Sequence, residues 1–154
     1  MVDDRAENYK EEIKMKKNTG FNNQRTFGVE IEFFLGRTNR RGAYAEEVAQ
    51  AVREQGIRCY VESYNHTTRP YWKIVIDSSV RYEGLEIVSP PLKGQDGFNQ
   101  LEKVLKALNQ VGAKVDKTCG LHVHHDASDF SLRTFKNLYG MYVRYEDCID
   151  ELVV

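Results

Sequence analysis

The sequence predicts an α+β domain in which helices pack on one face of a mostly antiparallel sheet. Several short segments alternate apolar and polar residues with a period of two, which is typical of strands that bury one face. The expected order is strand, helix, three strands, helix, strand, helix, without the regular strand-helix alternation of a parallel sheet. A chain of 154 residues can enclose one core, so we expect one domain.

Composition narrows the class of protein. The formal net charge of -1 gives no basic excess, so nucleic acid is not an expected partner. No apolar run is long enough to span a bilayer and the N-terminus is too charged for a secretory signal, so we expect no membrane partner and a cytoplasmic location. An odd number of cysteines without close spacing argues for reduced thiols rather than disulfides.

Residues 1–24 differ from the rest of the chain. They are rich in charged residues and Asn and contain few apolar side chains, so we expect a charged tail or a loosely attached helix. The domain itself is expected over residues 25–154.

The first expected strand, "TFGVEIEFFLG", places two carboxylates side by side. Val29 and Ile31 share the face that should pack on the core, and Glu30 and Glu32 share the opposite face. Helical spacing follows in "GAYAEEVAQAVREQG", which should end at Gly56 as a C-terminal cap.

Three strands are expected next, in "IRCYVES", "YWKIVIDSSV" and "GLEIVSPP". The last two are close enough to form an antiparallel hairpin. Apolar residues at helical spacing then predict a helix from Asp96, as N-cap, to Gly112. A final strand, "CGLHVHHD", precedes a long helix that starts after Ser131.

Alternation in this final strand sends Leu121 and Val123 toward the core and His122 and His124 to the other face. If the apolar residues of all strands face the helices, a group of acids and imidazoles gathers on the opposite face of the sheet. Its expected members are Glu30, Glu32, Glu86, His122 and His124, with Asp77 and Lys73 beside them.

Such a group suits a divalent cation. Side chains two apart on a strand lie roughly 7 Å apart, so neighbouring carboxylates can share a cation that relieves their repulsion. The oxygen ligands favour Mg²⁺ or Mn²⁺, and imidazole shifts the preference toward Mn²⁺ or Zn²⁺. The pair Glu30 and Glu32, or the pair His122 and His124, taken alone is also typical of a strand face exposed to solvent. The hypothesis of a metal site therefore rests on the combined pattern of three strands.

The segments "FGVEIEFF", "WKIVIDSSV", "GLEIVSPPL" and "CGLHVHHDAS", in this order, resemble the amidoligase family. That family is similar to the carboxylate-amine ligases, the superfamily of glutamine synthetase and glutamate-cysteine ligase. The resemblance runs from about Arg25 to the end and corresponds to the family's N-terminal half. It implies a glutamine synthetase-like sheet whose concave face binds ATP and Mg²⁺ or Mn²⁺. It also implies a reaction in which a carboxylate becomes an acyl phosphate and then an amide.

The resemblance also implies roles for individual residues. The substrates would be small-molecule or peptide carboxylates and amines, with specificity in loops such as "YNHTTRP". The implied metal ligands are Glu30, Glu32, Glu86, His122 and His124. The implied catalytic residues are Glu30, Glu32, Glu86 and Asp77, and the implied nucleotide or phosphate contacts are Lys73, Arg81 and His122.

Two departures from the family keep other functions open. "DSS" stands where the family tends to have Asp-Gly-Ser, and the chain stops at "YEDCIDELVV", where relatives continue into segments with arginines. We therefore expect a C-terminally shortened member. One alternative is a non-catalytic module on the same fold that binds or inhibits a partner protein. Another is a metal hydrolase in which His122, His124 and a Glu hold Zn²⁺.

Overall fold

The computed structural model describes residues 24–36, 41–80 and 84–153. The predicted tail therefore lies outside the described residues, except for Gln24. The helices and strands, in chain order, are β1 (Phe27–Phe33), α2 (Arg41–Glu54), β2 (Cys59–Val61), β3 (Trp72–Ile76), β4 (Leu85–Val88), α3 (Gly94–Gln110), β5 (Leu121–His125) and α4 (Leu132–Val153).

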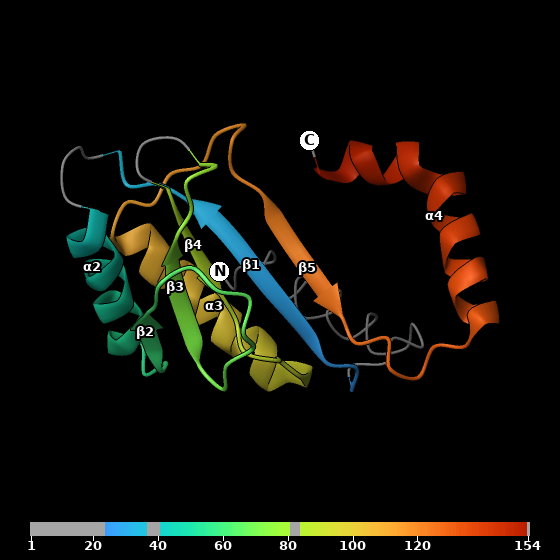
Figure 1. Ribbon diagram of the computed structural model, residues 1–154, viewed down its shortest axis with the longest axis horizontal. Helices are drawn as coiled ribbons and strands as arrows, with labels where there is room; N and C mark the ends of the chain where they lie inside the picture. Colours follow the sequence, from blue (N-terminus) through green and yellow to red (C-terminus); the bar gives the residue numbers. More distant parts are fainter. Residues whose placement is uncertain (1–23, 37–40, 81–83, 154) are drawn as a thin grey trace, which may run out of the picture.

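The strands form one five-stranded sheet in the order β2-β3-β4-β1-β5 (Figure 1). Neighbouring strands are antiparallel except for β2 and β3, which run parallel. The predicted α+β class and mostly antiparallel sheet are confirmed. The parallel pair arises because residues 62–71 form a loop that carries the chain from the end of β2 back to the start of β3.

Helices α2 and α3 pack side by side behind the sheet (Figure 1). Val48 and Val52 of α2 and Val104 of α3 are fully buried against the apolar face of the strands, where Ile74 and Ile87 are also fully buried. Helix α3 begins at Gly94, two residues before the predicted start, so Asp96 lies in its first turn instead of at the N-cap. A carboxylate there still interacts favourably with the helix dipole.

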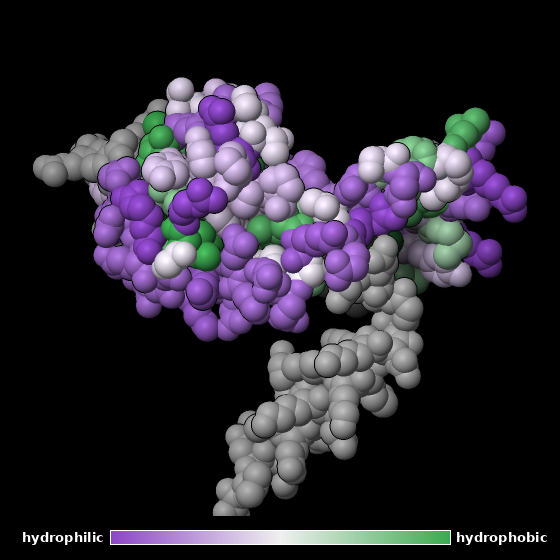
Figure 2. Space-filling view, turned by 90° about the horizontal axis from the view of Figure 1, so that it is seen from below, coloured by the Kyte–Doolittle hydropathy of each residue, from purple (hydrophilic) through white to green (hydrophobic). Residues whose placement is uncertain are grey.

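The prediction that every helix packs on the sheet is wrong for α4. All described side chains of α4 are exposed, and the helix stands clear of the sheet beyond β5 (Figures 1 and 2). Its amphipathic pattern needs an apolar surface to cover, but no other described helix or strand packs along it. No helix of the described residues combines the length and apolarity needed to cross a lipid bilayer.

A cluster around Arg25 fixes the turn between β5 and α4. The Arg25 guanidinium donates two hydrogen bonds to the Asp129 carboxylate, at 2.7 and 2.9 Å, and a third to the Asp126 backbone carbonyl. It also lies 4.9 Å from the centroid of the Phe130 ring, which meets Phe135 of α4 edge-on at 5.2 Å. Since Arg25 lies two residues before the start of β1, these contacts set the direction in which α4 leaves the sheet.

Two isoleucines on the same face of β3 allow a matched test of the core. Ile74 is fully buried and Ile76 is 37% exposed. We expect Ile74→Ala to lower the free energy of unfolding by about 2–5 kcal/mol, because it leaves a cavity. Ile76→Ala should cost less than about 1 kcal/mol. Urea denaturation of both variants measures the difference, and equal losses would contradict this assignment of the core.

Candidate functional site

Strand β1 lies between β4 and β5, and all three strands carry acidic or imidazole side chains on the same face of the sheet. In the register of the sheet, Glu30 lies opposite His122 of β5, and Glu32 lies opposite Glu86 of β4. His124 lies opposite Gly28 of β1, on the same face as Glu30. All five predicted metal ligands therefore lie on the face of the sheet away from α2 and α3.

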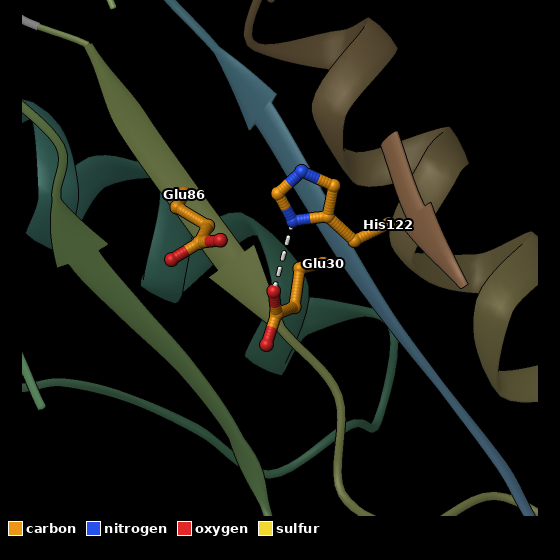
Figure 3. A group of neighbouring side chains, drawn as sticks. All are labelled: Glu30, Glu86 and His122. Atoms are coloured by element: carbon orange, nitrogen blue, oxygen red, sulfur yellow. Dashed lines mark hydrogen bonds and ion pairs between the residues drawn. The ribbon is translucent and has the colours of Figure 1, made fainter. Parts of the chain in front are cut away.

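Three of the five converge more closely than the others. One ligand atom each from Glu30, Glu86 and His122 lies within 4.8 Å of the other two (Figure 3). The Glu30 carboxylate lies 3.1 Å from His122 Nδ1 through Oε2 and 3.4 Å from His124 Nε2 through Oε1. Glu30 is thus shared by two imidazoles, and His124 approaches it on the oxygen that His122 does not use.

Carboxylates outnumber cationic groups in this cluster, and the effect is largest on the pKa of Glu86. Burial, together with the negative charges of Glu30, Asp77 and Glu32, raises the pKa of Glu86 from an ordinary 4.5 to about 7. The hydrogen bond to Glu30 raises the pKa of His122, and burial only partly opposes this. Burial would raise the pKa of Glu30, but its hydrogen bonds to His122 and His124 outweigh burial and hold it below the ordinary value. A cation would relieve this excess of negative charge.

Glu32 lies at the end of the cluster next to the start of β5. Its Oε2 accepts a hydrogen bond of 2.7 Å from the backbone N–H of Gly120. A Cβ at Gly120 would lie 3.1 Å from His122 Nε2 and 3.4 Å from the Glu32 carboxylate. Glycine at this position therefore lets the backbone approach both side chains closely.

Another predicted site residue, Asp77, lies in the turn after β3. Asp77 accepts hydrogen bonds from the backbone N–H and the hydroxyl of Ser79, at 2.8 and 2.6 Å, so it shapes the turn in which "DSS" replaces Asp-Gly-Ser. It is outside the group of converging ligand atoms but close enough to raise the pKa of Glu86. Arg81 lies outside the described residues.

The cluster forms part of the lining of an open cavity of about 1100 Å³. The strands β1, β4 and β5 supply one side, with Glu30, Glu86 and His122. The turn after β3 supplies another, with Asp77 to Ser79, and the loop at residues 62–71 supplies a third. A cavity of this size with convergent polar groups is the usual form of a small-molecule site.

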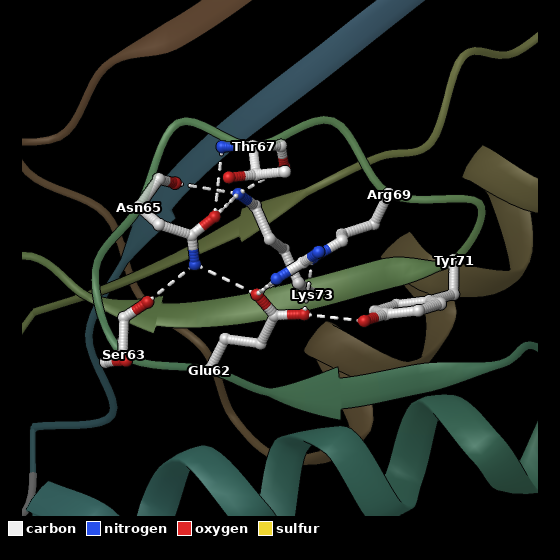
Figure 4. Close-up of polar contacts among 7 residues, drawn as sticks. All are labelled: Glu62, Ser63, Asn65, Thr67, Arg69, Tyr71 and Lys73. Atoms are coloured by element: carbon white, nitrogen blue, oxygen red, sulfur yellow. Dashed lines mark hydrogen bonds and ion pairs between the residues drawn. The ribbon is translucent and has the colours of Figure 1, made fainter.

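The loop at residues 62–71 is attached to the sheet by a buried ammonium (Figure 4). Lys73 is only 3% exposed, and its Nζ donates hydrogen bonds to Asn65 O, Asn65 Oδ1 and Thr67 O at 2.7, 3.0 and 3.0 Å. An ammonium has three N–H donors, and here the loop takes all three. In this structure Lys73 therefore holds the loop, and the phosphate contact implied for it stays a prediction.

Glu62 fixes the same loop from its other end (Figure 4). Its carboxylate accepts hydrogen bonds from the Arg69 guanidinium at 2.9 Å, the Tyr71 hydroxyl at 2.7 Å and the Asn65 amide at 2.9 Å. These bonds, from Arg69 first and then Tyr71, lower the pKa of Glu62 to about 2. The loop is a fixed wall of the cavity.

Sequence analysis assigned no role to Glu62, Arg69 or Tyr71, because contacts within an irregular loop follow no periodic pattern. A usable signal was the position of Lys73 between Trp72 and Ile74 in an apolar strand. A lysine that is buried in this way must find acceptors nearby.

With this geometry established, comparison with known proteins identifies the family. The sequence model of a protein family described as "Putative amidoligase enzyme" matches residues 23–154. The chain belongs to the amidoligase family. Comparisons with curated proteins and with solved structures find no match. The likeness to the glutamine synthetase fold therefore stays a prediction.

The ligand atoms in this amidoligase-family chain suit a divalent cation. Two carboxylates and one imidazole form a hard, mostly oxygen donor set of the kind that binds Mg²⁺ or Mn²⁺. Burial first, and then the negative charges of its neighbours, raise the pKa of Glu86, and a cation at that point would offset the repulsion among the carboxylates. Glu30, Glu86 and His122 are thus the residues that would hold the ion.

The pKa of Glu86 leads to a prediction about stability and pH. Since this carboxyl stays protonated in the folded protein up to about pH 7 but ionises near pH 4.5 when unfolded, stability should fall as pH rises through this window. Glu86→Gln removes the ionisation, so in metal-free buffer the variant should be more stable than wild type at pH 8, by up to about 3 kcal/mol.

Urea denaturation at pH 4.5 and pH 8 measures this difference. Near pH 4.5 the advantage of Glu86→Gln should vanish. The exposed residue Glu54 of α2 provides the control, because Glu54→Gln should change stability by less than about 0.5 kcal/mol at both pH values. An unchanged gap between wild type and Glu86→Gln at the two pH values would contradict the raised pKa.

Lys73 leads to a prediction about the loop. Lys73→Met keeps the length of the side chain but removes three hydrogen bonds to Asn65 and Thr67, so the loop should open more often. We expect chymotrypsin to cleave after the exposed residue Tyr64 roughly 10- to 100-fold faster than in wild type. Lys103→Met, on the exposed face of α3, is the control and should leave the cleavage rate unchanged.

Proposed function

We propose that this chain is an ATP- and Mg²⁺- or Mn²⁺-dependent ligase, or a part of one, that joins a small-molecule or peptide carboxylate to an amine. The observation that carries the proposal is the convergence of Glu30, Glu86 and His122 at an open cavity, in a chain of the amidoligase family. Family membership supports amide-bond formation only in general terms, and the metal and nucleotide are our inference from the cluster.

The proposed reaction has two steps. The carboxylate oxygen of the substrate attacks the γ-phosphorus of ATP, ADP leaves, and an acyl phosphate forms. The nitrogen of the amine then attacks the acyl carbon, inorganic phosphate leaves, and the amine loses a proton. The products are an amide, ADP and phosphate.

The residues of the cluster would serve the first step. Glu30, Glu86 and His122 would hold the divalent ion, whose role is to neutralise the charge of the phosphate oxygens. Without such an ion, the carboxylates would repel the triphosphate. Glu32 and His124 lie beside the three ligands, and Glu32 is held in place by the Gly120 N–H.

The fixed walls of the cavity would serve the second step. An acyl phosphate is readily hydrolysed, so the site must limit water and hold the amine close to the acyl carbon. The loop held by Lys73 and Glu62 and the turn shaped by Asp77 are the two walls available for this purpose. We therefore expect substrate specificity to depend on these two segments.

A zinc hydrolase has less support. Such a site commonly needs three protein ligands around one ion with one position open. His122 and His124 instead approach different oxygens of Glu30, and His124 lies outside the group of converging ligand atoms. We also place the protein in the cytoplasm, where ATP is abundant and where the thiols of Cys59, Cys119 and Cys148, all free here, stay reduced.

Nucleotide binding tests the proposal directly. Isothermal titration of the purified chain with ATP should show binding that requires Mg²⁺ or Mn²⁺. Glu30→Gln removes one charged ligand at nearly constant volume, and we expect at least about tenfold weaker binding. Glu54→Gln, on the opposite side of the sheet, is the matched control and should bind as wild type does.

A folded wild-type chain that binds no nucleotide with either metal would refute the ATP-dependent function. Binding that is equal in wild type and Glu30→Gln would instead place the nucleotide elsewhere on the protein.

A further inference from the structure

Helix α4 carries an apolar stripe that packs on no other described helix or strand, although its first residue, Phe135, meets the ring of Phe130 just before the helix. The stripe repeats every three or four residues, which is the spacing of a helix that packs along its length on another surface. Its members are Phe135, Leu138, Tyr139, Tyr142, Tyr145 and Ile149, which are between 36% and 73% exposed. Monomeric soluble proteins rarely leave an apolar surface of this extent uncovered.

A second uncovered apolar surface lies on the outer flank of α3. Phe98 and Leu105 lie two turns apart on this flank and are 46% and 45% exposed. The opposite flank of α3 faces β3, because Gln100 accepts a hydrogen bond from the Trp72 indole. Phe98 lies on the side of β1, with its ring 5.0 Å from that of Phe27. The outer flank of α3 therefore faces the edge of the sheet that ends in β5.

Strand β5 continues this surface. Leu121 and Val123 pair with Ile31 and Val29 of β1, so they lie on the helix side of the sheet, yet they are 66% and 52% exposed. We call the surface formed by Phe98, Leu105, Leu121 and Val123 the apolar trough. The flank of α3 and the edge strand β5 are thus left uncovered on the helix side of the described chain.

The stripe and the trough of one chain are kept apart. The Arg25 cluster holds the turn at residues 126–131 and directs α4 away from the sheet (Figure 1). In space-filling view, α4 projects from the body with apolar residues at its surface (Figure 2). In the described part of the chain, α4 thus carries an exposed apolar stripe, and the apolar trough is an exposed surface that is separate from it.

We propose that two copies of this chain form a twofold-symmetric dimer in which α4 of each copy packs in the apolar trough of the other. Because every copy carries one stripe and one trough, reciprocal exchange covers both surfaces on both copies and closes the assembly. A helix in the trough would also cover the unpaired edge of the sheet at β5, a usual protection against uncontrolled strand pairing.

The area available is sufficient for a stable dimer. Phe135, Tyr139, Tyr142 and Tyr145 are each about half exposed or more. At roughly 150–250 Å² per ring, these four side chains offer roughly 400 Å² per helix. Each contact buries the same area again on the trough, and the dimer contains two such contacts. The total is roughly 1,600 Å², which is the size of a standard specific interface.

The oligomeric state of the full chain tests the dimer. Size-exclusion chromatography with light scattering at micromolar concentration should give twice the mass of one chain. The stripe variant, Leu138→Glu with Tyr142→Glu, should be monomeric, as should the trough variant, Phe98→Glu with Leu121→Glu. The control variant, Lys136→Glu with Asn137→Glu, changes the charge of α4 outside the stripe and should stay dimeric. Circular dichroism checks that each variant is folded.

Mixing the variants tests the exchange itself. An equimolar mixture of stripe and trough variants restores one intact contact, an unaltered α4 in an unaltered trough, so heterodimers should form while each variant alone is monomeric. Should the trough variant fail to fold, Val123→Glu alone replaces it. A monomeric wild type overturns the proposal, as does a dimer that survives the stripe variant. Loss of the dimer in the stripe variant without rescue by mixing would also overturn it, since α4 would then pack on α4.

Discussion

The alternation of side chains along β1 is the constraint on which the rest of the structure depends. Val29 and Phe33 are buried on the helix side, while Glu30 and Glu32 lie on the other side. A slip of one residue would place both carboxylates beneath α2 and α3 and expose the core residues, at a large cost in free energy. The packing of the core thus also fixes the register in which Glu30 faces His122.

The same alternation explains how much the sequence could predict. A period of two assigns each strand residue to a face without reference to any partner strand, so the common face of Glu30, Glu86 and His122 follows from local patterns. Which ligand atoms come within reach of each other depends on the order β4-β1-β5, in which segments about ninety residues apart become neighbours. No local pattern contains that information, and this is why His124 and Glu32 could not be separated from the three in advance.

For two features the sequence shows a requirement without showing what meets it. The resemblance implied a phosphate contact for Lys73, which stays a prediction, and an amphipathic pattern suggested that α4 packs on the sheet, which is wrong. Both are statements about what a residue or a stripe requires, namely acceptors for Lys73 and an apolar surface for α4. The sequence shows the requirement but not which group meets it. Loop oxygens meet it for Lys73, and for α4 nothing in the described part of the chain does.

The walls of the site are held in place by hydrogen bonds, and its carboxylates outnumber the cationic groups near them. The first property matters for the second, because fixed walls keep the carboxylates close together. The Lys73 and Glu62 contacts fix the loop, and Gly120 fixes Glu32, so the cavity cannot relax by moving its walls. Burial of Glu86 and the repulsion from the neighbouring carboxylates together raise its pKa, so that it keeps its proton up to about pH 7. A cation that binds only the folded chain would displace this proton and stabilise the fold by mass action. The unfavourable charge at the site is therefore what would give a cation its binding free energy there.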